Sequence, residues 1–201
     1  METLKAAMVA SVRINWEALG CDPKIIVENS ERIRGRFIPT IDMNDEPVAV
    51  VAYGPSLRDT WREIEKFQTI FTCSGAHKFL VDRGIVPTHH IESDPRGHKV
   101  QMLGEPQPGV SYLIASNCHS NYFDKLEKAE AKILLWHVLF TEDEIFKLYP
   151  KGDWIITGGQ TVGPRTIRIA RLHGYTNLHV FGLDGSGQHA GIHTNKPDPA
   201  A

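Results

Sequence analysis

The chain has 201 residues, of which 41% are hydrophobic, so it is long enough to bury one sizeable core. Its formal net charge is -2, with 22 basic and 24 acidic residues, and it has no basic stripe for a polyanion, so nucleic acid is not expected as the main partner. Its three cysteines, Cys21, Cys73 and Cys118, lack a C-x-x-C spacing, which indicates reduced thiols in a cytoplasmic protein rather than disulfides or a zinc knuckle.

Residues 1–46 are predicted to form an amphipathic helix followed by a lead-in segment. An apolar residue recurs every four positions, at Leu4, Met8, Val12 and Trp16. This spacing predicts a helix over about residues 4–19, which either covers its own domain or packs against a second subunit of a homodimer. Residues 21–46 are polar and are expected to be partly ordered. Because no apolar run reaches 18 residues, we expect no membrane span.

From residue 47 to residue 201, short β-rich runs alternate with helical stretches. This alternation predicts a single α/β domain of the Rossmann-like kind, with a mostly parallel sheet and helices on both faces. The expected strands are 48–53, 69–73, 89–93, 111–115, 132–137, 154–157 and 178–183. The expected helices are 57–67, 76–83, 122–129, 142–149 and 162–173.

The first of these strands leads directly into a tight polar turn, Gly54-Pro55-Ser56. Gly54 can adopt backbone angles closed to other residues, Pro55 stiffens the turn, and Ser56 can cap the helix that follows. A helix that begins at the carboxyl end of a parallel strand presents free N–H groups, which favours phosphate. The alternative is a capped turn without a ligand, and the G-x-G-x-x-G and G-x-x-x-x-G-K-[ST] fingerprints are absent from the sequence.

Small, polar or acidic residues follow six of the expected strands. They are Gly54 to Ser56, Ser74-Gly75, Asp94 to Arg96, Ser116 to His119, Gly158 to Thr161 and Asp184 to Ser186. Open α/β sheets bind ligands in the crevice outside the carboxyl ends of their strands. The sequence therefore predicts a binding crevice along this edge of the sheet.

Four short motifs also occur in a characteristic order. They are Gly54-Pro55-Ser56-Leu57, Asp94-Pro95 after the run Gly84 to Pro87, Gly158-Gly159 before His173-Gly174-Tyr175, and Gly182-Leu183-Asp184 followed by His193. In these motifs the chain resembles, over roughly residues 47–193, the MptE-like domain of archaeal 6-hydroxymethylpterin diphosphokinases. The same domain occurs in motility accessory factors that transfer nonulosonic sugars. The resemblance implies a Rossmann-like fold distantly similar to bacterial sialyltransferases.

The resemblance also implies a nucleotide-binding site. It places the nucleotide against Gly54, Pro55 and Ser56, and the surrounding strand-end residues that we expect to contribute are Ser74, Asn117, Gly158, Gly159 and Thr161. A diphosphokinase would transfer pyrophosphate from ATP to a small hydroxymethylated, pterin-like acceptor. Such a reaction needs Mg²⁺, for which Asp94 and Asp184 are the predicted ligands, and a cation, for which Arg96 and Arg165 are candidates. Either aspartate could instead be an ordinary turn residue.

A glycosyltransferase that uses a CMP-activated sugar is the alternative reaction. It would need a general base, for which His119 and His193 are candidates. The predicted catalytic residues are thus Asp94, Asp184 and His193. A zinc site at His189 and His193 is disfavoured by Gly191 between them, and Cys118 is interpreted as structural. A nucleotide-binding module without catalysis is the third hypothesis.

Overall fold

The structure is a computed structural model that describes residues 16–17, 22–140, 143–159 and 161–185. Seven strands form one sheet in the order β6-β5-β4-β3-β2-β1-β7, and every pair of neighbours is parallel. The strands are β1 (Asn44–Val51), β2 (Thr69–Cys73), β3 (His89–Glu92), β4 (Ser111–Ala115), β5 (Lys132–Val138), β6 (Ile155–Ile156) and β7 (Tyr175–Phe181). The predicted α/β, Rossmann-like architecture is confirmed.

Helices cover the sheet between the strands. They are α1 (Ile25–Arg32), α2 (Leu57–Thr60), η1 (Trp61–Lys66), α3 (Ala76–Val81), η2 (Gly97–Leu103), α4 (Ser120–Lys128), α5 (Asp143–Phe146) and α6 (Val162–Leu172). The single helix expected over 57–67 is divided into a short α-helical turn and a 3₁₀ helix. The sequence did not predict α1 or η2. Among the described residues, no helix is both long and apolar enough to span a membrane.

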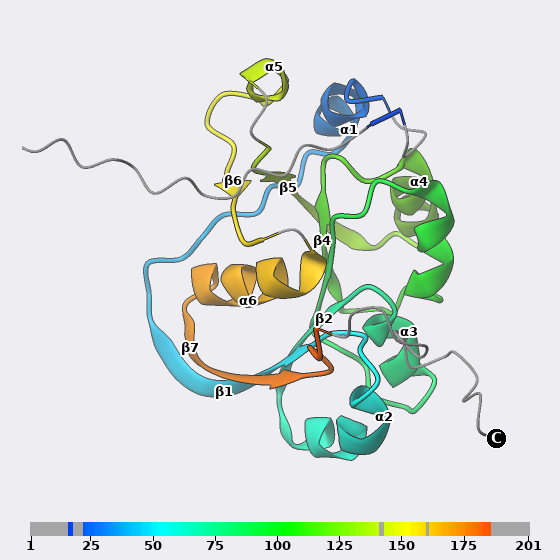
Figure 1. The fold of residues 1–201 in the computed structure, drawn as a ribbon, viewed down its shortest axis with the longest axis vertical. Helices are drawn as coiled ribbons and strands as arrows, with labels where there is room; N and C mark the ends of the chain where they lie inside the picture. The colour runs from blue at the N-terminus through cyan, green and yellow to red at the C-terminus, as the bar shows by residue number, and fades with distance from the viewer. Residues whose placement is uncertain (1–15, 18–21, 141–142, 160, 186–201) are drawn as a thin grey trace, which may run out of the picture.

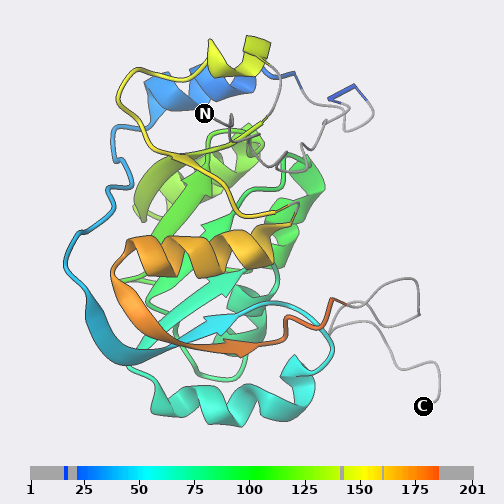
Figure 2. The same ribbon diagram turned by 60° about the vertical axis from the view of Figure 1, so that its left-hand side comes forward.

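The order of the strands explains why helices lie on both faces. The steps from β1 to β6 all go in one direction across the sheet, so right-handed connections place their helices on one face. Helix α6 then returns the chain across the opposite face to β7, which pairs with β1. Figures 1 and 2 show α6 in the hollow of the curled sheet, with α3 and α4 on the other side.

Strand β1 is buried on both faces, as its apolar run predicts. Val50 belongs to the larger hydrophobic cluster, which includes residues of α6, and Ala49 and Val51 belong to the smaller one, beneath α2 and α3. Strands β2 and β4 are buried along their whole length. Continuous burial of this kind is typical of the central strands of a parallel sheet.

The segment before β1 is packed more closely than its polar sequence suggests. Ile26 of α1 and Phe37 are part of the larger hydrophobic cluster. The buried side chain of Asn29 donates hydrogen bonds to the carbonyl oxygens of Ser116 (2.8 Å) and Cys118 (2.9 Å), just beyond β4. Helix α1 therefore holds the loop that follows β4. Except for Trp16 and Glu17, which lie in a turn, the helix predicted over residues 4–19 falls outside the described residues.

Candidate functional site at the carboxyl edge of the sheet

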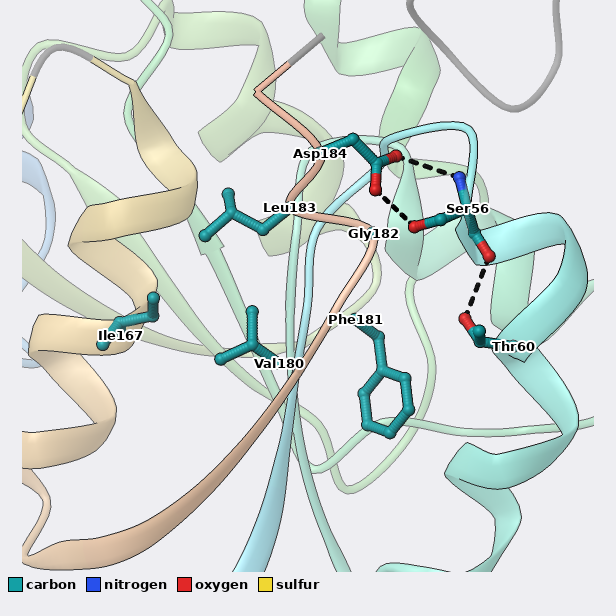
Figure 3. Close-up of a pocket in the computed structure, with 8 residues that line it drawn as sticks. All are labelled: Ser56, Thr60, Ile167, Val180, Phe181, Gly182, Leu183 and Asp184. Atoms are coloured by element: carbon teal, nitrogen blue, oxygen red, sulfur yellow. Dashed lines mark hydrogen bonds between the residues drawn. The ribbon is translucent and has the colours of Figure 1, made fainter.

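The Gly54–Ser56 turn is held against the end of β7 by Asp184. The Gly54 N–H donates to the carbonyl of Gly182 (2.8 Å), and the Ser56 N–H donates to Asp184 Oδ2 (2.9 Å). The Ser56 hydroxyl donates to the other carboxylate oxygen, Asp184 Oδ1, as Figure 3 shows. A Cβ atom at Gly54 would lie 2.3 Å from Asp184 Oδ2 and 2.5 Å from the Gly182 carbonyl oxygen, so this close approach requires glycine.

This arrangement changes the expected chemistry of the turn. Ser56 does not cap α2 with its side chain, because its hydroxyl is bound to Asp184 instead. The Ser56 N–H was expected to be available for phosphate, but it already has a carboxylate as its acceptor. A second anion at this position would be repelled by Asp184. The turn as it stands suits polar neutral groups better than phosphate.

A shallow pocket of about 470 Å³ lies beside this turn. Its lining is apolar on the side of β7 and α6 and polar on the side of the turn, and consists of Ser56, Thr60, Ile167, Val180, Phe181, Gly182, Leu183 and Asp184. Figure 3 shows Ile167 projecting from α6 and Phe181 from the end of β7. An apolar wall beside a few hydrogen-bonding groups is the usual lining of a small-molecule site.

Ser93, Asn117 and Arg165 form a second group of site residues, which we call the central cluster. The Asn117 side-chain amide donates to the Ser93 carbonyl (2.7 Å), and Arg165 Nη1 donates to the Ser93 hydroxyl (3.1 Å). These contacts join the ends of β3 and β4 to α6. A Cβ atom at Gly158 would lie 3.1 Å from Arg165 Cα, and Gly158 has a φ of +142°, which glycine alone adopts readily.

Asp94 and Arg96, two predicted site residues that follow Ser93, form an ion pair with each other. Arg96 donates to the Asp94 carboxylate through Nε (2.9 Å) and Nη2 (2.5 Å), and its backbone N–H donates as well (3.0 Å). Burial alone would raise the pKa of Asp94, but the hydrogen bonds and the charge of Arg96 outweigh it and lower that pKa. Asp94 is therefore an ionised carboxylate with a cationic partner.

Glu92, the last residue of β3, is a buried carboxyl group that the sequence analysis missed. It is 1% exposed, and its Oε1 accepts from the backbone N–H groups of Ser93 (2.8 Å) and Asp94 (3.0 Å). The Tyr122 hydroxyl lies 3.2 Å from Glu92 Oε2 and 2.8 Å from the Lys99 carbonyl oxygen. The phenol has one proton and the carbonyl can only accept, so a protonated Glu92 that donates to Tyr122 satisfies all three groups. Burial raises the pKa of Glu92, which agrees with this assignment.

A further buried chain of hydrogen bonds supports the loop that carries Asn117. His137 Nδ1 lies 2.8 Å from Ser116 Oγ, and its Nε2 lies 3.0 Å from Asp153 Oδ2, which also accepts from Arg36 (2.7 Å). The carboxylate can only accept, so we assign the imidazole proton to Nε2 and let Ser116 donate to Nδ1. No sequence pattern predicts this hydrogen-bonded network, because its members come from four separate segments.

The remaining predicted residues have more local roles. Ser74, which has a φ of 52°, places its hydroxyl 3.9 Å from the sulfur of Met102. His119 caps α4 by accepting from the Asn121 N–H (3.3 Å), and Thr161 stands at the start of α6 without a side-chain cap. Cys118 is fully buried, and burial raises its pKa well above the usual value, so it is an unreactive thiol. His189 and His193 lie outside the described residues.

The structure does not bring the two predicted metal ligands together. Asp94 follows β3 and Asp184 follows β7, and these strands are three positions apart in the sheet, about 14 Å at the spacing of neighbouring strands. Each carboxylate already has protein partners, Arg96 for Asp94 and Ser56 for Asp184. No group of three or more His, Cys, Asp or Glu side chains is placed to hold a metal ion in the part of the chain that the structure describes. A magnesium site at these residues stays a prediction.

Comparisons with known proteins bear on the family and the fold. The sequence profile of the family described as "6-hydroxymethylpterin diphosphokinase MptE-like" matches residues 24–188. Among solved structures, the fold is similar to that of the MAf glycosyltransferase from Magnetospirillum magneticum AMB-1, with a TM-score of 0.68 at 16% sequence identity. That similarity covers 87% of this chain but 29% of the glycosyltransferase chain. A search of curated proteins gave no match. Because the family profile spans most of the sequence, the chain belongs to the 6-hydroxymethylpterin diphosphokinase MptE-like family.

Proposed function

We propose that this protein is a nucleotide-dependent transferase that moves pyrophosphate from ATP to a small hydroxymethylated acceptor of the pterin kind. Its family and its fold support a transferase. The observation that carries the proposal is that the pocket beside Asp184 and the central cluster both lie at the first turn of α6. A Cβ atom at Gly163 would lie 2.5 Å from Leu183, next to Asp184, and two residues later Arg165 reaches Ser93.

The pocket beside Asp184 and the central cluster would bind different parts of the nucleotide and its acceptor. The pocket beside Asp184 offers an apolar wall and hydrogen-bonding groups for a flat ring, and the central cluster offers a cation for phosphate. Transfer of a phosphoryl group depends mainly on positioning and on offsetting charge. Mg²⁺ would supply charge neutralisation when bound. Asp94 and Asp184 follow strands that are three positions apart and would not hold one ion together, so Asp94, which directly follows Ser93 of the central cluster, is the carboxylate that would contact it.

A glycosyltransferase that uses a CMP-activated sugar is the second candidate. It is favoured by the similarity in fold to the MAf glycosyltransferase. Among the described histidines, His119 would be its general base, with Nε2 as the acceptor because Nδ1 already accepts from Asn121. A nucleotide-binding module without catalysis is the third candidate.

The test is the melting temperature of the protein with ATP, GTP, CTP and CMP, each with and without Mg²⁺. A ligand that binds only the folded state raises the melting temperature, by an amount that grows with its concentration relative to Kd. We expect a Mg²⁺-dependent shift with ATP that is reduced in Asp94→Asn. Asp82→Asn is the matched control, because Asp82 is an exposed carboxylate that pairs with Lys78 on α3.

The next measurement is turnover of ATP with 6-hydroxymethylpterin. Formation of AMP and a diphosphorylated pterin would establish the diphosphokinase. A metal-independent shift with CMP or CTP would favour the glycosyltransferase, and stabilisation by a nucleotide without any turnover would favour the binding module. If no nucleotide changes the melting temperature, the proposed function is wrong.

A further inference from the structure

Arg165 is a buried cation for which the described residues provide no counter-ion. It is 7% exposed, and among the described residues the one hydrogen bond of its side chain goes to the neutral hydroxyl of Ser93, 3.1 Å away. Its Nε–H is buried without a partner. By contrast, the arginines that pair with carboxylates, Arg32, Arg36 and Arg96, have side chains that are 25% to 43% exposed. Removing a guanidinium from water without an anion is strongly unfavourable, so an anion is expected at this position.

A second buried polar atom in the same cluster also lacks a partner. Asn117 is 2% exposed, and its side-chain oxygen Oδ1 accepts no hydrogen bond from the described residues. Its orientation is fixed, because the amide nitrogen donates to the Ser93 carbonyl and a flipped amide would place two oxygens together. The central cluster therefore has an unsatisfied donor at Arg165 and an unsatisfied acceptor at Asn117.

The first turn of α6 adds a favourable field for an anion. The helix has eleven residues, no acidic residue in its first turn, and no side-chain cap from Thr161. It begins just after Gly158 and Gly159, whose φ values are +142° and +87°. The amino end of such a helix attracts negative charge. The Gly54–Ser56 turn is different, because the Asp184 carboxylate already occupies it.

We propose that the phosphate groups of the nucleotide bind at the central cluster, held by Arg165 and the amino end of α6, and not on the Gly54–Ser56 turn. Asn117 Oδ1 accepts a hydrogen bond from a hydroxyl group of the same ligand, as the ribose next to a phosphate provides. This inference rests on the proposed function only for the identity of the ligand as a nucleotide. The anion site itself is independent of that identity.

Binding of inorganic pyrophosphate, measured by calorimetry, tests the anion site. Loss of a charge-assisted contact is expected to weaken binding about 10- to 100-fold in Arg165→Met. Arg168→Met is the matched control, since Arg168 is an exposed arginine on the same helix, and its affinity should stay within about threefold of the wild type. Ser56→Ala should also bind pyrophosphate normally. If Arg165→Met does not fold, Ser93→Ala, which removes the hydroxyl that orients Arg165, should weaken binding by a smaller factor.

The inference is overturned if the wild type does not bind pyrophosphate, if Arg165→Met or a folded Ser93→Ala binds it unchanged, or if Ser56→Ala loses it. Asn117→Ala distinguishes the hydroxyl group of the ligand from its phosphates. This variant should bind ATP more weakly but bind pyrophosphate as tightly as the wild type. ATP that binds through Ser56 and independently of Arg165 would preserve the proposed function and refute this site. Pyrophosphate that binds through Arg165, with no nucleotide bound, would preserve the site and refute the proposed function.

Discussion

Two carboxyl groups at the end of β3 show how strongly local surroundings decide the charge of a residue. Glu92 points into the protein, where burial favours its neutral form, and Asp94 points towards Arg96, which favours its ionised form. The sequence Glu-Ser-Asp predicts a polar strand end but not this difference. The residues around Glu92 include Tyr122, which is 30 positions away in the chain.

Replacing Glu92 with Gln should stabilise the protein more at pH 8 than at pH 5. The pKa of Glu92 is raised in the folded state, so the fold keeps a proton that the unfolded chain loses above a pKa of about 4.3. The stability that depends on this proton is present at low pH and is lost as the pH rises. Glutamine does not titrate and can donate to Tyr122. Melting temperatures at both pH values test this, with exposed Glu63→Gln as control, and an equal effect at both would contradict it.

Gly54→Ala should destabilise the protein by about 1–3 kcal/mol, because the added methyl group meets the Gly182 backbone and the Asp184 carboxylate. Gly97→Ala is the comparison at a less crowded position. A Cβ atom at Gly97 would lie 3.1–3.2 Å from the ring of His119, and this side chain can shift. Its cost should be clearly smaller. Urea unfolding measures both variants. Equal costs would show that the Gly54 turn relaxes easily and that Asp184 does not hold it.

At the scale of helices and strands, the sequence predicted the elements that carry their own pattern. The strands at 69–73 and 111–115 were placed at their observed bounds, because continuous burial leaves a short uncharged run rich in β-branched and aromatic residues. Gly54 was expected to need unusual backbone angles, but its φ is not positive, and glycine is required there because a Cβ atom would meet Asp184 and Gly182. Gly158 does have the unusual angle, with a φ of +142°. Helix α1 was missed because its stability comes from contacts with distant residues, such as those of Asn29, and not from a clear periodicity.

Asn29→Ala should cost about 2 kcal/mol of stability, because it leaves the buried carbonyl groups of Ser116 and Cys118 without a donor. Glu28→Ala on the exposed side of α1 is the control and should change stability by less than about 0.5 kcal/mol. Urea unfolding measures both. Equal values for the two variants would show that α1 is not needed to hold the loop after β4.

At the scale of the whole molecule, five histidines in the described part of the chain are held in a neutral state. Burial lowers the pKa of His77 to about 4 and that of His89 to about 3, and it lowers the pKa values of His90, His137 and His173 as well. Three of them, His77, His90 and His137, are completely inaccessible to solvent. The sequence shows ten histidines but not which are enclosed, because enclosure depends on how the whole sheet is packed.

The free energy of unfolding should therefore decrease as the pH falls from about 6.5 towards 4. In this range the unfolded chain binds protons at these histidines and the folded protein does not, so protonation favours unfolding. Each such histidine contributes up to about 1.4 kcal/mol per pH unit. Urea unfolding at pH 6.5, 5.5 and 4.5 measures the slope, which should become shallower in His77→Gln. A stability that is independent of pH in this range would contradict the assigned neutral states.

The pairing of β1 with β7 ties the folding of this protein to its synthesis. Val48 on the first strand lies beside Leu178 on the last, and Ser56 meets Asp184 across 128 positions. On a ribosome, which makes the chain from its amino end, β1 therefore has an open edge until almost the whole domain has emerged. Closing so long a loop is slow, and an unpaired apolar strand invites association with other chains in the meantime. The turn beside Asp184 is consequently among the last parts of the molecule to form.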